Sequence, residues 1–195
     1  PSRSIRWSGD EGATWRDFDV FNVFDISFGP RCSPIVARDI ASDIWISKFT
    51  ADGRTQLWQT IIGGGAADST VWSEGAGLIT DVAGNLYLVG HTASTDFPDQ
   101  RFGTGAQSGY FVSKLDPDGA LVFTTLLPGI TVAAITTDRA GNVVAVGTVS
   151  SDSVPVTADA DQREFMGTYA GFVLRLSLSG QVVYASYFNQ GALNV

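Results

Sequence analysis

An internal repeat limits the folds open to this chain of 195 residues more than any other feature of its sequence. The run Thr-Asp-Val-Ala-Gly-Asn-Leu-Tyr-Leu-Val-Gly at 80–90 recurs at 137–147 as Thr-Asp-Arg-Ala-Gly-Asn-Val-Val-Ala-Val-Gly. A second pattern occurs three times, as Trp-Ile-Ser-Lys-Phe at 45–49, Phe-Val-Ser-Lys-Leu at 111–115 and Phe-Val-Leu-Arg-Leu at 172–176. Copies spaced by about 60 residues indicate one supersecondary unit that is repeated and stacked on itself.

The first pattern contains a hairpin-type turn followed by a strand. The turn residues that its two copies share are Asp81, Gly84, Asn85, Asp138, Gly141 and Asn142. We expect the glycines to hold a positive φ, which other residues adopt only with strain. In the strand that follows, at 86–92, Tyr87 and Val89 lie on one face and Leu86 and Leu88 on the other. Both faces are apolar, as expected of a strand between two neighbouring sheets.

The second pattern is the first strand of another hairpin. In the middle copy, residues 110–115 and 120–127 flank the turn Asp-Pro-Asp-Gly at 116–119. Four short antiparallel strands in each unit, with no helix of ten residues, predict an all-β fold made of β-propeller blades.

The predicted blades number about three, at 1–62, 76–127 and 131–188. Propellers typically need four to eight blades, so three would leave apolar blade faces in water. We therefore expect other polypeptide to complete the ring. Either a second copy of the chain or the remainder of a longer parent protein would serve.

Charge and composition exclude several classes of partner. Lys and Arg together number 12 and Asp and Glu 20, for a net charge of −8, so the basic stripe that nucleic acid requires is missing. No apolar run approaches the ~18 residues of a membrane span. The single cysteine, Cys32, and the single histidine, His91, argue against a disulfide framework and a metal site of paired imidazoles or thiolates. We predict no metal and no cofactor.

The order of motifs at 81–90, 92–98 and 109–119 resembles the bacterial SBBP β-propeller repeat. The resemblance rests on Asp-x-x-Gly-Asn-x-Tyr-x-x-Gly, a Thr/Ser segment with Asp-Phe-Pro, and Phe-Val-x-Lys-Leu-x-x-x-Gly. The last copy departs from it where Ser-Val-Pro at 153–155 replaces Asp-Phe-Pro. The resemblance implies a scaffold protein that is secreted or displayed on the bacterial cell surface.

A motif near the N-terminus is similar to the Asp-box of sialidase-like propellers. Its residues are Ser8, Asp10, Gly12, Thr14 and Trp15. Side-chain oxygens accept the turn amides, glycine supplies a positive φ and the tryptophan packs beneath. We interpret the motif as a structural hairpin, because Asp-boxes lie away from the active site in that family.

Four residues are candidate ligand contacts. Lys48, Lys114 and Arg175 occupy one position in successive copies of the second pattern. Such cations either make the same structural ion pair in every blade, for instance with a turn aspartate, or bind an anionic ligand. Trp72 lies in a predicted loop and is the candidate exposed aromatic contact, whereas Trp45 and Trp58 align with core aromatics.

Two short motifs have simpler interpretations than the functions they suggest. Asp-Pro-Asp-Gly at 116–119 resembles the start of a calcium loop, but no suitably spaced glutamate follows, so we interpret it as a β-turn. The three glycines at 63–65 lack the lysine of a phosphate loop, and we interpret them as a linker between blades.

The sequence thus favours a non-enzymatic propeller that acts as a structural or binding module for protein assembly. Two alternatives stay open: a carbohydrate-binding, lectin-like propeller, for which Trp72 is the candidate sugar contact, and a fragment of a sialidase-like, glycan-active enzyme. No catalytic residues are assigned.

Overall fold

The computed structural model of the chain describes residues 4–7, 16–19, 23–29, 33–40, 43–70, 77–97, 100–101 and 108–188. Every regular element in these ranges is a β-strand, and none is a helix. The strands form three larger sheets and one separate two-stranded pair. The all-β, antiparallel character predicted from the repeat is therefore confirmed.

The first sheet contains four consecutive antiparallel strands. They are β3 (Val23–Gly29), β4 (Ser33–Ile40), β5 (Asp43–Phe49) and β6 (Gln56–Ile62). Two earlier strands, β1 (Ser4–Trp7) and β2 (Arg16–Asp19), pair only with each other. The expected unit at 1–62 thus divides into a hairpin and a four-stranded sheet.

The middle sheet is built around one long strand, β9 (Leu86–Thr92). On one side it pairs with β11 (Gly109–Leu115), which continues to β12 (Leu121–Leu127). Its other side pairs with two short strands, β7 (Asp68–Thr70) and β8 (Leu78–Thr80). A further short strand, β10 (Gln100–Arg101), runs parallel to β12 at the outer edge of the sheet.

The last sheet has the simplest connectivity. Its strands β13 (Ile130–Thr137), β14 (Val143–Val149), β15 (Ala170–Leu176) and β16 (Val182–Phe188) follow one another in antiparallel order. The strand β13 takes the place along β14 that β7 and β8 together take along β9.

The three sheets have the same strand register, including a register shift at the same position of the outer hairpin. In the outer hairpin of each sheet, Lys48 lies opposite Trp58, Lys114 opposite Phe123 and Arg175 opposite Tyr184. The register shifts immediately after each of these three cations, so that one residue of the outer strand is extra, as in a β-bulge. The extra residues are Leu57, Val122 and Val183, and all three are exposed. The sequence repeat is therefore a structural repeat.

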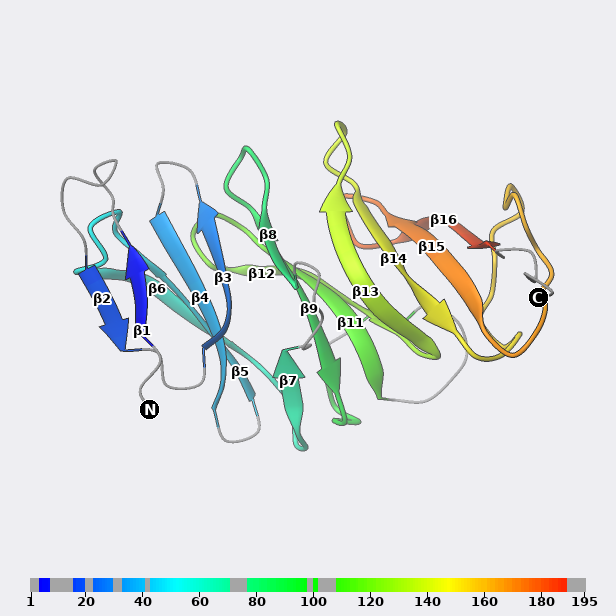
Figure 1. Cartoon of the computed structure of the whole chain (residues 1–195), viewed down its shortest axis with the longest axis horizontal. Coiled ribbons are helices and arrows are strands. Elements are labelled where there is room, and N and C mark those ends of the chain that lie inside the picture. Colours follow the sequence, from blue (N-terminus) through cyan, green and yellow to red (C-terminus); the bar gives the residue numbers. More distant parts are fainter. Residues whose placement is uncertain are drawn as a thin grey trace, which may run out of the picture.

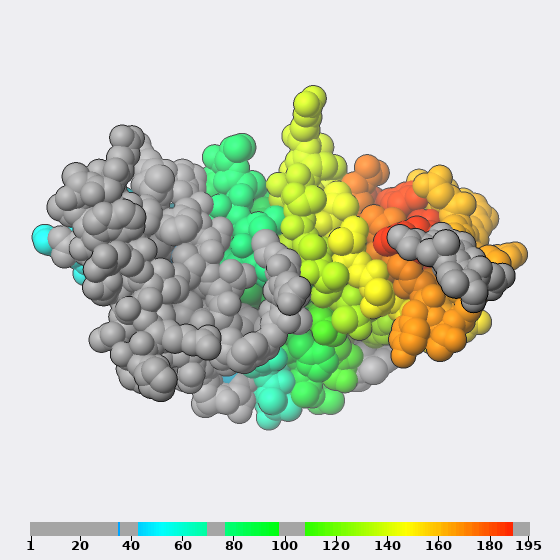
Figure 2. Space-filling view, viewed as in Figure 1, coloured from blue at the N-terminus to red at the C-terminus, as the bar shows by residue number. Residues whose placement is uncertain are grey.

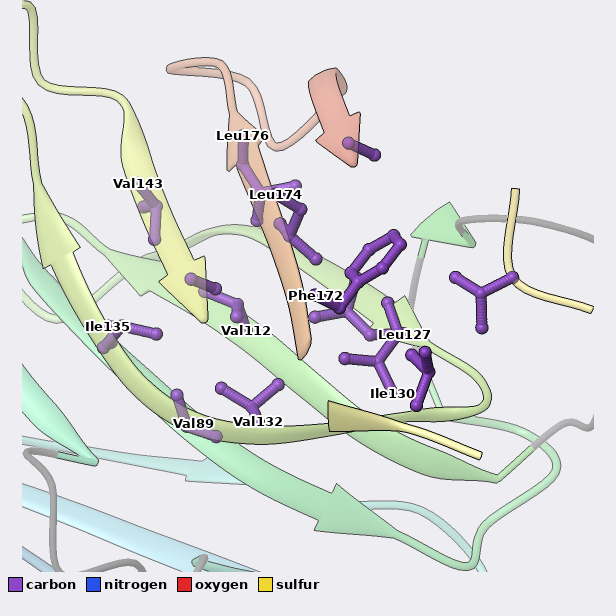
Figure 3. Packing of buried hydrophobic residues seen from close by; sticks show 14 of the residues in the cluster. Val89, Val112, Leu127, Ile130, Val132, Ile135, Val143, Phe172, Leu174 and Leu176 are labelled. Carbon is purple, nitrogen blue, oxygen red and sulfur yellow. The ribbon is translucent and has the colours of Figure 1, made fainter. Parts of the chain in front are cut away.

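The sheets stand side by side in a row, and the middle sheet buries both of its faces (Figure 1). Leu86 and Leu88 of β9 pack toward the first sheet, in a cluster that includes Ile44. Tyr87 and Val89 pack toward the last sheet. This arrangement confirms the prediction that β9 is apolar on both faces because it lies between two neighbouring sheets. Figure 3 shows the second of these cores, between β9, β11 and β12 and the strands of the last sheet.

The two Asp-x-x-Gly-Asn turns have the predicted backbone. Gly84 has a φ of 88° and Gly141 a φ of 81°. These turns join β8 to β9 and β13 to β14, and they project from the same edge of the row, as the green and yellow-green segments of Figure 2 show.

Candidate functional site

The first and middle sheets each contact the outer turn of the next sheet through a threonine hydroxyl. The Thr60 hydroxyl donates to the carbonyl of Gly119, and the Thr125 hydroxyl donates to the carbonyl of Gly180 at 2.7 Å. Both threonines lie at one register position, since Thr60 is opposite Ile46 and Thr125 is opposite Val112. The same polar contact is therefore built twice, and the sequence patterns gave no sign of it.

The recurring cations lie on the face of each sheet that points toward the next one. The Lys48 ammonium donates to the carbonyl of Pro117 at 3.1 Å, and the Trp58 indole N–H donates to the same carbonyl at 2.9 Å. Lys114 is only 8% exposed, and its ammonium lies 5.4 Å from the centroid of the Tyr87 ring. Lys48 and Lys114 thus contact a carbonyl and an aromatic ring, whereas the third cation, Arg175, interacts through its charge with the turn aspartate Asp138.

Arg175, the third cation, lies on the outer face of the last sheet. Among the described residues, no further sheet packs on this face. We call this surface the open face and define it by Val144, Val146, Val173, Arg175 and Phe188, which adjoin one another in register or lie on alternate positions of neighbouring strands. Val146 occupies the repeat position of Val89, yet it is 38% exposed, whereas Val89 is 2% exposed under the last sheet. The difference follows from what covers each face, because the local strand structure is the same.

The projecting turns are organised by their aspartates. Asp81 Oδ1 accepts the backbone N–H groups of Ala83 and Asn85, and Oδ2 accepts the Asn85 side-chain amide and the Tyr87 hydroxyl. Burial alone raises the pKa of Asp81, but these hydrogen bonds outweigh it and hold the pKa below the usual value. Burial and the nearby Asp81 charge raise the pKa of the Tyr87 phenol.

The second turn repeats this pattern. Asp138 accepts from the backbone N–H groups of Ala140 and Asn142 and from the Asn142 side chain. Those bonds, the side-chain one foremost, lower the pKa of Asp138, and the charge of Arg175 lowers it slightly more. The Tyr87 hydroxyl lies 3.5 Å from the Gly141 carbonyl, so the two turns are neighbours. Their polar groups serve the turns themselves.

A buried carboxylate at the start of the middle sheet is a feature that the sequence analysis missed. Asp68 accepts hydrogen bonds from the Ser94 hydroxyl and from the Gly64 N–H, the latter at 2.7 Å. The next amide, Gly65 N–H, donates to Asp96 at 2.7 Å. The glycines at 63–65 thus connect two sheets, as predicted, and also donate to two carboxylates. Contacts between residues about 30 positions apart leave no local pattern in a sequence.

The turn at 116–119 uses its aspartate as a turn residue. Asp116 Oδ1 accepts the backbone N–H groups of Asp118 and Ala120, and Gly119 has a φ of 85°. This geometry agrees with the β-turn interpretation. Within the described ranges, no three His, Cys, Asp or Glu side chains gather closely enough to share a metal ion.

Several predicted site residues lie outside the described residues. These are Ser8, Asp10, Gly12, Thr14 and Trp15 of the Asp-box motif, together with Cys32 and the candidate contact Trp72. His91 is described: it is exposed on β9, and its ring meets that of Tyr110 edge-on at 5.4 Å. Trp45 and Trp58, expected in the core, are each only partly buried.

Comparison with protein-family models found no match, and comparison with curated proteins found none either. Over the part of the chain that the structure describes, no helix has the length and apolar character needed to cross a membrane. The candidate site therefore rests on the structure alone: it is the open face of the last sheet, at the end of a row of repeated contacts.

Proposed function

We propose that the chain is a non-enzymatic β-propeller module that assembles with further polypeptide. Its three larger sheets act as blades in this proposal, and the open face is where the next blade docks. The resemblance to the SBBP repeat supports a secreted or cell-surface location for such a scaffold. In this proposal, the apolar and cationic residues that recur at equivalent positions of the repeat have one role, which is to contact the next blade.

The observation that carries the proposal is the state of equivalent residues in successive sheets. Ile46 and Val112 are fully buried because the next sheet covers them, whereas Val173, at the same position of β15, is only partly buried. Ser186 occupies the position of Thr60 and Thr125, opposite Val173, but it is buried and its hydroxyl is already hydrogen-bonded to Gln162. The open face thus has the apolar side chains and the cation that lie toward a following sheet elsewhere in the chain. Exposed apolar surface with polar groups beside it is typical of an interaction site.

Light scattering on the purified chain tests the proposal. The expected result is a particle larger than one chain of 20.7 kDa, for instance two copies that together supply about six blades. Val146→Asp should reduce the mass to that of one chain, because it places a charge in the docking surface. Val82→Asp is the matched control, since Val82 is fully exposed in a turn away from the open face. A wild-type monomer that unfolds cooperatively would overturn the proposal.

A further inference from the structure

No described segment pairs with the outer edge of the first sheet, whereas the same edge of the other two sheets is covered by the chain itself. The edge strand β6 pairs with β5 and with no other described strand. In the middle sheet, Gln100 and Arg101 lie along the equivalent strand β12, opposite Thr125 and Leu126. The equivalent edge is therefore paired in the middle sheet and unpaired by any described segment in the first sheet.

The last sheet is covered in the same way by the segment at 157–162. The Thr157 N–H donates to the Ala185 carbonyl at 3.0 Å, and the Tyr187 N–H donates to the Gln162 carbonyl at 3.2 Å. The Gln162 N–H also donates to the Ser186 hydroxyl. The covering segment thus satisfies the backbone groups that an edge strand would otherwise present to water.

Loop length explains why the first sheet lacks this cover. In the middle and last sheets, the covering segment belongs to the long connections at 93–108 and 150–169 between the second and third strands. The equivalent connection of the first sheet joins Ile40 to Asp43 through two residues. Two residues cannot reach across β5 to the far side of β6, because strands lie about 4.8 Å apart.

One side chain of β6 is exposed at a position that is buried in the other two sheets. Ile61 lies opposite Trp45, as Leu126 lies opposite Phe111 and Tyr187 opposite Phe172. Leu126 and Tyr187 are buried in the cores between neighbouring sheets, whereas Ile61 lies on the face of β6 that points away from the middle sheet and is 58% exposed. The shared register also directs the Ile61 N–H and the Gln59 carbonyl outward, like the equivalent groups of Tyr187 and Ala185.

We propose that β6 is a β-augmentation site that takes an extended segment of a different polypeptide, running parallel to β6. The occupied copies define its chemistry. Phe97 precedes β10 and packs against Phe111 with ring centroids 4.7 Å apart, and Val154 fills the equivalent core position beside the last sheet. In the sequence a proline follows each of them. The ligand is therefore a strand-forming peptide with a bulky apolar residue followed by proline, whose apolar side chain lies beside Trp45 and Ile61.

The source is another polypeptide because the three segments of this chain that have a bulky apolar residue before proline, at 97–98, 127–128 and 154–155, already lie in their own sheets. Main-chain pairing supplies affinity in this mode of recognition, and the pocket for alternate side chains supplies specificity. The site is on a different sheet from the open face, so the inference does not rest on the proposed assembly.

A synthetic peptide with the sequence of residues 93–102, Ala-Ser-Thr-Asp-Phe-Pro-Asp-Gln-Arg-Phe, is a suitable probe. We expect saturable binding of the fluorescently labelled peptide to the full chain in a polarisation assay. A peptide in which serine replaces the phenylalanine before proline is the matched control and should bind about tenfold more weakly or not at all. No saturable binding of the first peptide, or equal binding of both, would overturn the proposal.

Variants of Ile61 locate the site on the protein. Ile61→Pro removes the outward N–H, and proline is tolerated where that group faces solvent, so peptide affinity should fall about tenfold. Ile61→Lys tests the apolar contact without altering the backbone, and Ile61→Val should retain binding. Unchanged affinity in both the proline and lysine variants would refute the site. A rise in mass with concentration that Ile61→Pro abolishes and Val146→Asp leaves intact would instead assign the edge to a second copy, which also contradicts the proposal.

Discussion

The contact between the first and middle sheets can be tested by adding one methyl group to the turn at 116–119, which lies in that contact. Gly119 has a φ of 85°, and a Cβ atom there would lie 2.6 Å from Cδ2 of the Trp58 ring. Gly141 has nearly the same φ, 81°, but its Cβ would meet only a methyl carbon of Leu178, at 3.0 Å. Leu178 is exposed and can move aside. The two glycines therefore differ in their neighbours and not in their backbone.

The expected costs follow from these neighbours. Alanine in the left-handed region costs about 1–2 kcal/mol, of which reduced freedom of the unfolded chain offsets about 0.4–1 kcal/mol. Gly141→Ala should thus lower the free energy of unfolding by about 1 kcal/mol. Gly119→Ala must also displace the indole, which loses the hydrogen bond from Trp58 to Pro117 and disturbs its packing. These effects add between about 1.5 and 4.5 kcal/mol.

Urea unfolding followed by circular dichroism measures both losses in the free energy of unfolding. The comparison holds if the slope of this free energy against urea concentration is the same for all variants. In a Trp58→Ala background, Gly119→Ala should cost no more than Gly141→Ala, because the obstructing ring is gone. Equal costs for the two glycine variants in the wild-type background would refute the inter-sheet contact. No cost for either would refute the left-handed turns.

Three further expectations can be checked by similar measurements. Gly84→Val should lower the melting temperature, because a β-branched residue at positive φ is strained by roughly 1–2 kcal/mol; an unchanged melting curve would contradict the turn geometry. Thr125→Val should cost about 1–3 kcal/mol in urea unfolding by leaving the Gly180 carbonyl without its donor, whereas Thr148→Val on an exposed position should cost little. Asp81 has a lowered pKa in the folded state, so its stabilisation is complete above its ordinary pKa of 3.8 and is lost as the pH falls through the folded value. The stability difference between wild type and Asp81→Asn should therefore shrink in acid titrations below pH 3.8, and a constant difference would contradict this account.

Local sequence patterns predicted the strands and turns of the repeat well. The strand at 86–92 was predicted with its bounds, and both of its apolar faces are buried as expected. Alternating apolar residues and Asp-x-x-Gly-Asn turns determine such elements within a few residues, so a single copy is informative and a second copy reinforces it.

Contacts between repeats were less predictable. Thr60 and Gly119 are 59 residues apart, and the hydroxyl that joins them is an ordinary strand residue in the sequence. Trp58 aligned with core aromatics but keeps part of its surface in solvent, because its indole N–H reaches the Pro117 carbonyl at the edge of the sheet contact. The repeat shows which positions are equivalent in the three sheets. The burial and contacts of each position depend on which sheet packs against it.

The bulge that follows each cation makes the outer hairpins tolerant of a change in length. Strand side chains alternate between faces, so a one-residue deletion normally inverts every side chain beyond it. Val122 is the extra residue between the pairs Lys114–Phe123 and Leu115–Leu121, so its removal leaves both pairs opposite each other. Residues from Phe123 onward keep the face they pack on. Deletions at the bulge positions are thus absorbed within the hairpin, and copies of the repeat can differ by a residue there while their stacking surfaces stay the same.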